Sequence, residues 1–141
     1  MHVGKVVEVW RYPVKSMGGE AVAQALVDAG GLAGDRHWAV IDGDAREIRS
    51  AKRWPELLGY VARYVGGRTP ATDAYAAAVI PVEIAGPDGR ILHSAAADRD
   101  AELSAWLQRA VRLSPRAPAH DRDHYRLARA RALESTAAGM D

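Results

Sequence analysis

The stretch VGKVVEVWRYPVKSMGGE spans residues 3–20 and sets the class of fold that the sequence predicts. Over residues 3–12, β-branched and aromatic side chains occupy both alternating phases, which predicts a strand buried on much of both faces. Pro13 has no N–H for a sheet and Gly18-Gly19 follows it, so the strand should end there in a loop. The beginning of the sequence therefore predicts a β protein.

On the C-terminal side of this stretch, short apolar runs recur between turn residues along most of the chain. A turn at Asp42-Gly43-Asp44 and the sequence Gly86-Pro87-Asp88-Gly89 predict hairpins, and Pro55 near the start of residues 53–58 predicts a short helical turn. The expected strands cover residues 3–12, 20–29, the later half of 35–42, 59–65, 74–85, 90–94 and 110–113.

One amphipathic helix is expected late in the chain. Asp98 is its predicted N-cap, Leu103, Trp106 and Leu107 follow the i, i+3, i+4 spacing, and the helix should end near Arg109. Many short strands with one late helix predict a mainly β fold, an antiparallel β-barrel of short strands, and not a series of βαβ units.

The length of 141 residues fits one domain. We expect the β-barrel to occupy residues 1–114 and a poorly packed tail to occupy residues 115–141. Pro115 and Pro118 break regular structure there, and few large apolar residues follow them.

The composition excludes several classes of protein. The chain has no cysteine, which excludes disulfides, thiolate nucleophiles and thiolate-bound metals. A net charge of +1 argues against a nucleic-acid partner. No apolar run approaches the ~18 residues that cross a bilayer, and the start lacks the layout of a secretory signal. We therefore expect a cytoplasmic protein with no membrane partner.

Lys15 and Ser16 form the first candidate anion site, just after the first predicted strand. Pro13 stiffens this turn, and Gly18-Gly19 would let a ligand approach the backbone. An ammonium, a hydroxyl and nearby amides are the donors that a phosphate needs. The alternative is a pair of solvated loop residues.

Gly34-Asp35-Arg36 forms the second candidate cluster, at the entry to another strand. Arg36 would add a bidentate guanidinium to the same anion, with Asp35 orienting it or accepting turn amides. The alternative is a structural Asp–Arg pair on the rim of the barrel.

Two other groups of residues are expected to have structural roles. Trp10 and Trp38 are expected in the core and not as a platform for a ligand. His120 and His124 stand at i and i+4, but a third ligand and an orienting second shell are missing, so no metal site is expected. No catalytic set of residues is recognisable either.

Three motifs together resemble one known family. V-x-x-V-W-R-Y-P-V-K-S-M-x-G-E at residues 6–20, G-L-x-G-D-R-x-W-A-V-x-D at 31–42 and A-K-R-W-P-E-L-L at 51–58 occur in order. They resemble the N-terminal β-barrel domain of MOSC-family proteins, which include the mitochondrial amidoxime-reducing components and the C-terminal part of molybdenum-cofactor sulfurases. The resemblance covers about residues 3–114.

The resemblance implies a function for the two candidate clusters. In full-length relatives the barrel packs beside a MOSC domain, and the molybdenum cofactor lies between the two. Lys15, Ser16 and Arg36 match the residues that hold the phosphate end of this cofactor. The implied cofactor is therefore the molybdenum cofactor, bound through its phosphate end, or none when this chain is alone.

The same resemblance limits what the chain does by itself. The cysteine that ligates molybdenum belongs to the MOSC domain of the relatives, and this sequence has no cysteine. The expected function is a cofactor-binding module that is not catalytic alone, with a separately encoded MOSC protein as its partner. The alternative is a structural or small-molecule-binding β-barrel that no longer binds the cofactor. An autonomous enzyme has the least support.

Overall fold

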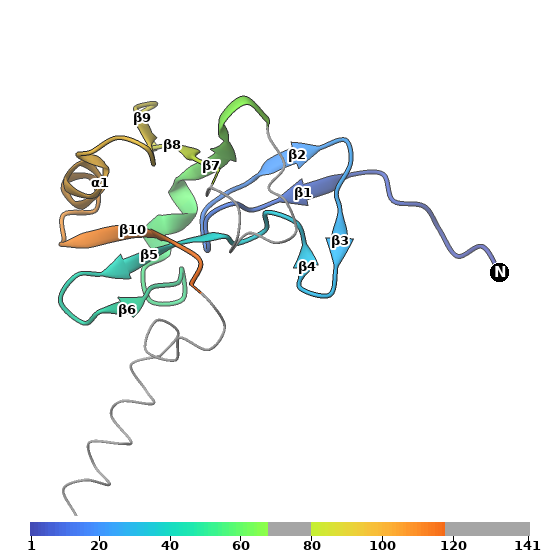
Figure 1. The fold of residues 1–141 in the computed structure, drawn as a ribbon, viewed down its shortest axis with the longest axis horizontal. Coiled ribbons are helices and arrows are strands. Elements are labelled where there is room, and N and C mark those ends of the chain that lie inside the picture. The colour runs from blue at the N-terminus through green and yellow to red at the C-terminus, as the bar shows by residue number, and fades with distance from the viewer. Residues whose placement is uncertain (68–79, 118–141) are drawn as a thin grey trace, which may run out of the picture.

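The computed structural model describes residues 1–67 and 80–117. Its strands are β1 (Val9–Arg11), β2 (Glu20–Val22), β3 (Val27–Asp28), β4 (Gly31–Leu32), β5 (Trp38–Asp42), β6 (Glu47–Ile48), β7 (Val61–Tyr64), β8 (Val82–Ala85), β9 (Ile91–His93) and β10 (Val111–Pro115). Its helices are the 3₁₀ turns η1 (Pro55–Gly59) and η2 (Val65–Gly67) and the α-helix α1 (Arg99–Leu107) (Figure 1). The named strands pair antiparallel throughout, so the predicted mainly β class is confirmed.

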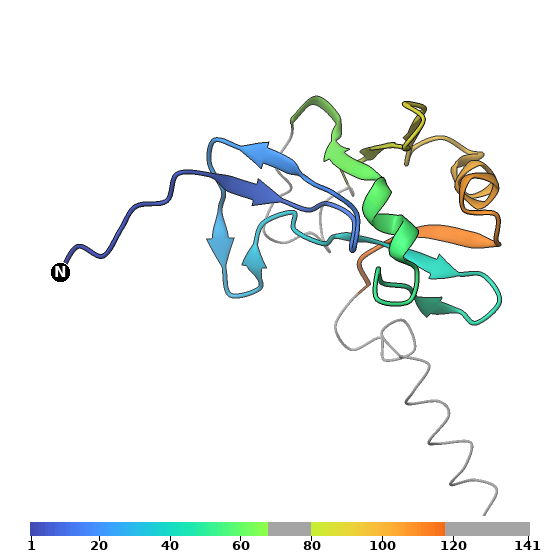
Figure 2. The same cartoon turned by 180° about the vertical axis from the view of Figure 1, so that it is seen from behind.

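The strands form four small sheets, and two isolated bridges link the segment after β1 to two of them. The sheets have the orders β1-β2, β3-β4, β10-β5-β6 and β7-β8-β9. Val14 pairs with Trp38 of β5, and Gly18 pairs with Val61 of β7, each as a parallel bridge. Seen from both sides, β1–β4 lie at one end of the molecule and α1, β8 and β9 at the other (Figures 1 and 2). The segment after β1 therefore contacts both the sheet that contains β5 and the sheet that contains β7.

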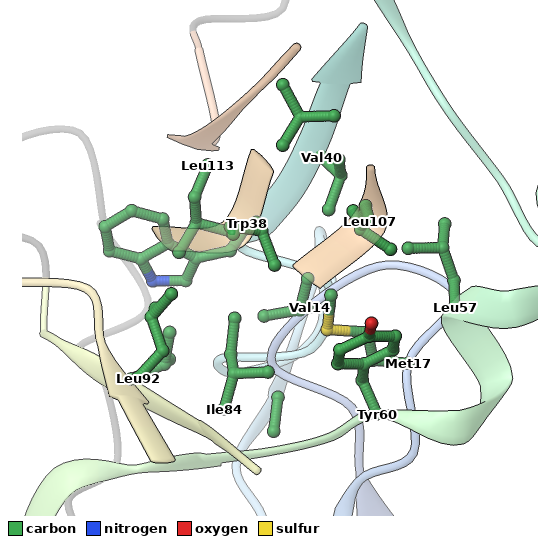
Figure 3. Close-up of a cluster of buried hydrophobic side chains, with 14 of the residues drawn as sticks. Val14, Met17, Trp38, Val40, Leu57, Tyr60, Ile84, Leu92, Leu107 and Leu113 are labelled. Carbon is green, nitrogen blue, oxygen red and sulfur yellow. The ribbon is translucent and has the colours of Figure 1, made fainter. Parts of the chain in front are cut away.

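The core is built from apolar side chains of nearly all these elements. Figure 3 shows side chains from β5, β10, η1, α1 and the sheet β7-β8-β9 facing one another around Val14 and Met17. Val14, Val40, Leu57, Ile84 and Leu92 are fully buried. Trp38 is 5% exposed, which confirms its predicted place in the core.

Helix α1 confirms the one α-helix that the sequence predicts. Leu103 and Leu107 are buried, while Trp106 packs against the core from its edge. Asp98 occupies the N-cap position, and its backbone carbonyl accepts the N–H of Glu102 at 2.9 Å. Among the described residues, its side chain makes no capping hydrogen bond. Asp100 Oδ1 accepts the N–H of Leu113 at 2.9 Å, so the helix is tied directly to β10.

The first strand is much shorter than predicted. β1 contains only Val9–Arg11, and the side chains of Val3, Val6 and Val7 are 80% or more exposed. No described strand pairs with residues 3–8, so their apolar side chains have nothing to bury against. The placement of Trp10 in the core is also wrong, because this side chain is 47% exposed.

The second predicted strand, 20–29, is interrupted. β2 can pair only along the three residues of β1, and the pairing ends at Val9 opposite Val22. The chain then turns, and β3 forms a separate hairpin with β4.

Other predictions meet the structure only in part. The strand expected over 74–85 appears as β8 from Val82, and residues 74–79 lie outside the described part of the chain. Pro55 begins η1 as expected, and β10 runs to Pro115. Within the described ranges, no helix has the length and apolar character required to cross a membrane.

Candidate functional site

The two predicted clusters lie side by side, held together by backbone hydrogen bonds. Arg36 N–H donates to the Tyr12 carbonyl at 2.6 Å, and Trp38 N–H donates to the Pro13 carbonyl at 3.0 Å. In return, Lys15 N–H donates to the Trp38 carbonyl at 2.9 Å. Residues 12–15 therefore run alongside residues 36–38, and the two cationic residues lie on neighbouring backbone segments.

The side chains of this corner offer several donors. The Arg36 side chain is 61% exposed, forms an ion pair with Asp35 at 2.5 Å, and has its guanidinium carbon 5.9 Å from the centre of the Tyr12 ring. Lys15 and Ser16 are half-buried. Across residues 1–67 and 80–117, no ion pair involves the Lys15 ammonium and no hydrogen bond involves the Ser16 hydroxyl. The residues that carry these ammonium, hydroxyl and guanidinium donors therefore belong to two adjoining backbone segments.

Two of the three predicted site residues have a strained backbone. The φ angles of Ser16 and Arg36 are +69° and +54°, in the left-handed region that side chains rarely adopt. Such conformations persist only where the surrounding structure fixes them, and they gather at binding sites. Here the N–H of Met17 closes the turn on the Val14 carbonyl at 3.3 Å, and Arg36 is fixed by its bond to Tyr12.

Asp35 has both of the roles that its sequence position allowed. One carboxylate oxygen, Oδ1, accepts the backbone N–H of Tyr12 at 2.8 Å, and the other pairs with Arg36. The carboxylate therefore links the two loops and also orients the exposed guanidinium. This geometry includes the structural Asp–Arg pair that was the alternative interpretation.

The two glycines after Ser16 serve the fold and do not open the backbone to a ligand. A Cβ on Gly19 would lie 2.2 Å from the carbonyl oxygen of Arg11, and one on Gly18 would lie 3.1 Å from Cγ2 of Val61. The expectation that they admit a ligand is therefore wrong, because neighbouring segments of the same chain occupy that space.

The sequence interpretation missed three residues beneath this corner: Arg11, Glu20 and Tyr64. The Tyr64 hydroxyl donates to the Gly34 carbonyl at 2.7 Å, and Arg11 pairs with Glu20 at 2.6 Å. In an extended strand Arg11 would point to the same side as Val7 and Val9. A charged residue on an otherwise apolar side of a strand indicates a buried charge with a partner, and this signal could have identified Arg11. Nothing in the sequence links Tyr64 to Gly34.

Two small cavities lie elsewhere on the molecule. Each holds about 200 Å³; one is lined by Tyr60, Pro87, Arg90 and Trp106 among others, and the second lies on the face of β7-β8-β9. Neither includes a predicted site residue. The described ranges hold no cluster of three metal-ligating side chains, and His120 and His124 lie outside them.

These observations define a small, mainly antiparallel β module with a cationic corner between two adjoining loops. The family model described as the MOSC N-terminal beta barrel domain matches residues 3–112. The chain belongs to this family, as the three motifs predict. No curated protein matches the chain.

Proposed function

We propose that this module provides the phosphate-binding side of a molybdenum-cofactor site, with Lys15, Ser16 and Arg36 as the residues that hold the phosphate. The observation that carries the proposal is the backbone pairing of residues 12–15 with 36–38, which gathers cations from two separate motifs. Membership of the MOSC N-terminal family supports the choice of ligand.

The donors fit the phosphate end of the cofactor. The Lys15 ammonium has no ion pair within the described ranges, and Arg36 keeps unpaired guanidinium N–H groups beside its bond to Asp35. A phosphate accepts several charge-assisted hydrogen bonds at once, which suits a hydroxyl, an ammonium and a planar guanidinium together. When bound, the cofactor would supply the redox chemistry of molybdenum.

Catalysis is proposed to need a partner with a MOSC domain. No residue of this sequence provides a thiolate for the metal. The apolar side chains of Val3, Val6, Val7 and Trp10 are exposed in the N-terminal segment and β1, where they would be available to such a partner. In this account the module binds and orients the phosphate, and the partner holds the metal.

The Asp35–Arg36 pair favours a second candidate function. If Asp35 and Arg36 only fasten the two loops together, the chain is a structural or small-molecule-binding domain that no longer binds the cofactor. Replacing these residues would then lower stability without changing the affinity for any phosphate.

Thermal melting with and without pyrophosphate separates the two functions. A ligand that binds only the folded state raises the melting temperature. We expect pyrophosphate to raise that of the wild type, and Lys15→Ala and Arg36→Ala to reduce the increase. No increase in the wild type, or an equal increase in all three proteins, would contradict the proposal.

A further inference from the structure

Tyr64 lies beneath the cationic corner at the end of β7. Its side chain is 2% exposed, and its hydroxyl donates to the Gly34 carbonyl at 2.7 Å. Burial raises the pKa of this hydroxyl, although the nearby Arg11 charge partly opposes the shift. The phenol therefore stays protonated and remains a donor to Gly34.

A partly buried ion pair packs against the Tyr64 ring. Arg11 and Glu20 face each other across β1 and β2 and form a salt bridge of 2.6 Å, with Arg11 only 2% exposed. The Arg11 guanidinium carbon lies 4.8 Å from the centre of the Tyr64 ring. The ring is thus held on one face by a cation that is itself fixed by a carboxylate.

Tyr64 hydrogen-bonds to Gly34, which belongs to the same turn as Arg36. Gly34 and Arg36 both have positive φ, of +81° and +54°; glycine adopts this region without a steric penalty, so the strain of the turn lies at Arg36. In the described part of the chain, two side chains hold this turn. The Tyr64 side chain hydrogen-bonds to its backbone, and the Asp35 side chain connects it to the first loop. Asp35 fastens the turn to Tyr12, and Tyr64 fastens it to the core.

Resting on the function proposed above, we infer that Tyr64 is a positioning residue for the phosphate site, acting through Gly34 on Arg36. The Arg36 side chain is 61% exposed, so packing does not fix the place of its guanidinium. The Asp35 carboxylate and the backbone of the turn place it, and the bond from Tyr64 to Gly34 helps to hold that backbone together with the bond from Arg36 N–H to Tyr12. A site held in its binding geometry before the ligand arrives loses less entropy on binding.

The substitution Tyr64→Phe tests this inference because it removes one hydroxyl and keeps the ring. Pyrophosphate affinity is measured by titration calorimetry, well below the melting temperature of each protein. Tyr64→Phe should weaken binding roughly threefold to tenfold, the loss that one hydrogen bond supports. The salt dependence of binding should not change, because every charge remains.

Tyr60→Phe is the matched control. The Tyr60 hydroxyl lies 3.5 Å from the Trp106 carbonyl, away from the cationic corner, and that residue is also buried. The control should bind pyrophosphate as the wild type does. Equal affinities for the wild type and Tyr64→Phe would overturn the inference.

A second measurement keeps this test separate from that of the proposed function. If the wild type does not bind pyrophosphate, the proposed function fails, but the positioning role can still be measured by amide hydrogen exchange. Tyr64→Phe should speed exchange at Arg36 N–H, which donates to Tyr12, and should leave Arg49 N–H, which donates to Val40, less affected. Equal changes at the two amides would show a general loss of stability and would overturn the inference.

Discussion

The backbone N–H of Tyr12 donates to Asp35 Oδ1 at 2.8 Å, although the two residues are 23 positions apart. The N–H of Arg36, next to Asp35, donates back to the Tyr12 carbonyl at 2.6 Å. These two hydrogen bonds bring the two distant motifs together. Asp35 therefore connects the loops and also lies next to the proposed anion site.

The charge of Asp35 should oppose phosphate binding. The change Asp35→Asn retains an oxygen that can accept the Tyr12 N–H and removes the negative charge beside Arg36. Pyrophosphate should therefore bind about threefold more tightly to Asp35→Asn at low salt, and high salt should reduce the difference. Calorimetry at two salt concentrations measures both effects.

Asp35→Ala is the companion variant, because it removes the acceptor as well as the charge. It should melt at a lower temperature than Asp35→Asn, since the Tyr12 N–H loses its partner. Weaker pyrophosphate binding by Asp35→Asn than by the wild type would contradict the expected effect of its charge.

Two adjacent leucines of η1 test the described core. Leu57 is fully buried and Leu58 is 67% exposed, although both belong to one short 3₁₀ turn. Leu57→Ala should lower the free energy of unfolding by about 2–5 kcal/mol, because it leaves a cavity in the core. Leu58→Ala should change it by less than about 0.5 kcal/mol. Urea unfolding measures both, and similar losses would contradict the described packing.

Stability should fall in acid through Asp42. Burial opposes its ionisation, but hydrogen bonds from Arg49 and from the N–H groups of Ala45 and Asp44 outweigh burial and lower the pKa of the carboxyl. A lowered pKa in the folded state contributes stability above the ordinary value of about 3.9. That stability is lost as the pH falls through the lowered pKa.

The variant Asp42→Asn isolates this contribution. It should be less stable than the wild type at pH 7, and the difference should shrink as the pH falls below about 4, as followed by urea unfolding at each pH. Asp44→Asn, exposed in the same turn, is the control. A constant difference between wild type and Asp42→Asn down to pH 2 would contradict the assigned cause.

Much of the fold follows from local sequence signals. Pro55 marks the start of η1, and the spacing of Leu103 and Leu107 predicts the buried face of α1. Local patterns cannot show whether a strand has a partner or which of its faces is covered. For the first reason the prediction over residues 3–8 failed, and for the second Trp10 is exposed although it pairs with Ala21.

The same limit applies to the site. Local composition identified Lys15, Ser16 and Arg36 as anion-binding candidates, and it allowed Asp35 to accept a turn amide. Tyr64 was not identified, because its contact with Gly34 spans 30 positions and depends on how β7 packs beneath the loop. Gly19 was misinterpreted for a related reason, since the close approach of Arg11 exists only in the folded chain.

Two arginines that differ chiefly in location test whether this corner of the domain binds phosphate. Arg36 and Arg63 have side chains that are each 61% exposed, and each pairs with a carboxylate that is 19% exposed, on Asp35 and Glu83 respectively. In calorimetric titration with pyrophosphate, Arg36→Ala should weaken binding about tenfold or more, and Arg63→Ala should leave it within about twofold of the wild type. Equal affinities for the two variants would contradict the assignment of a phosphate site to this corner of the domain.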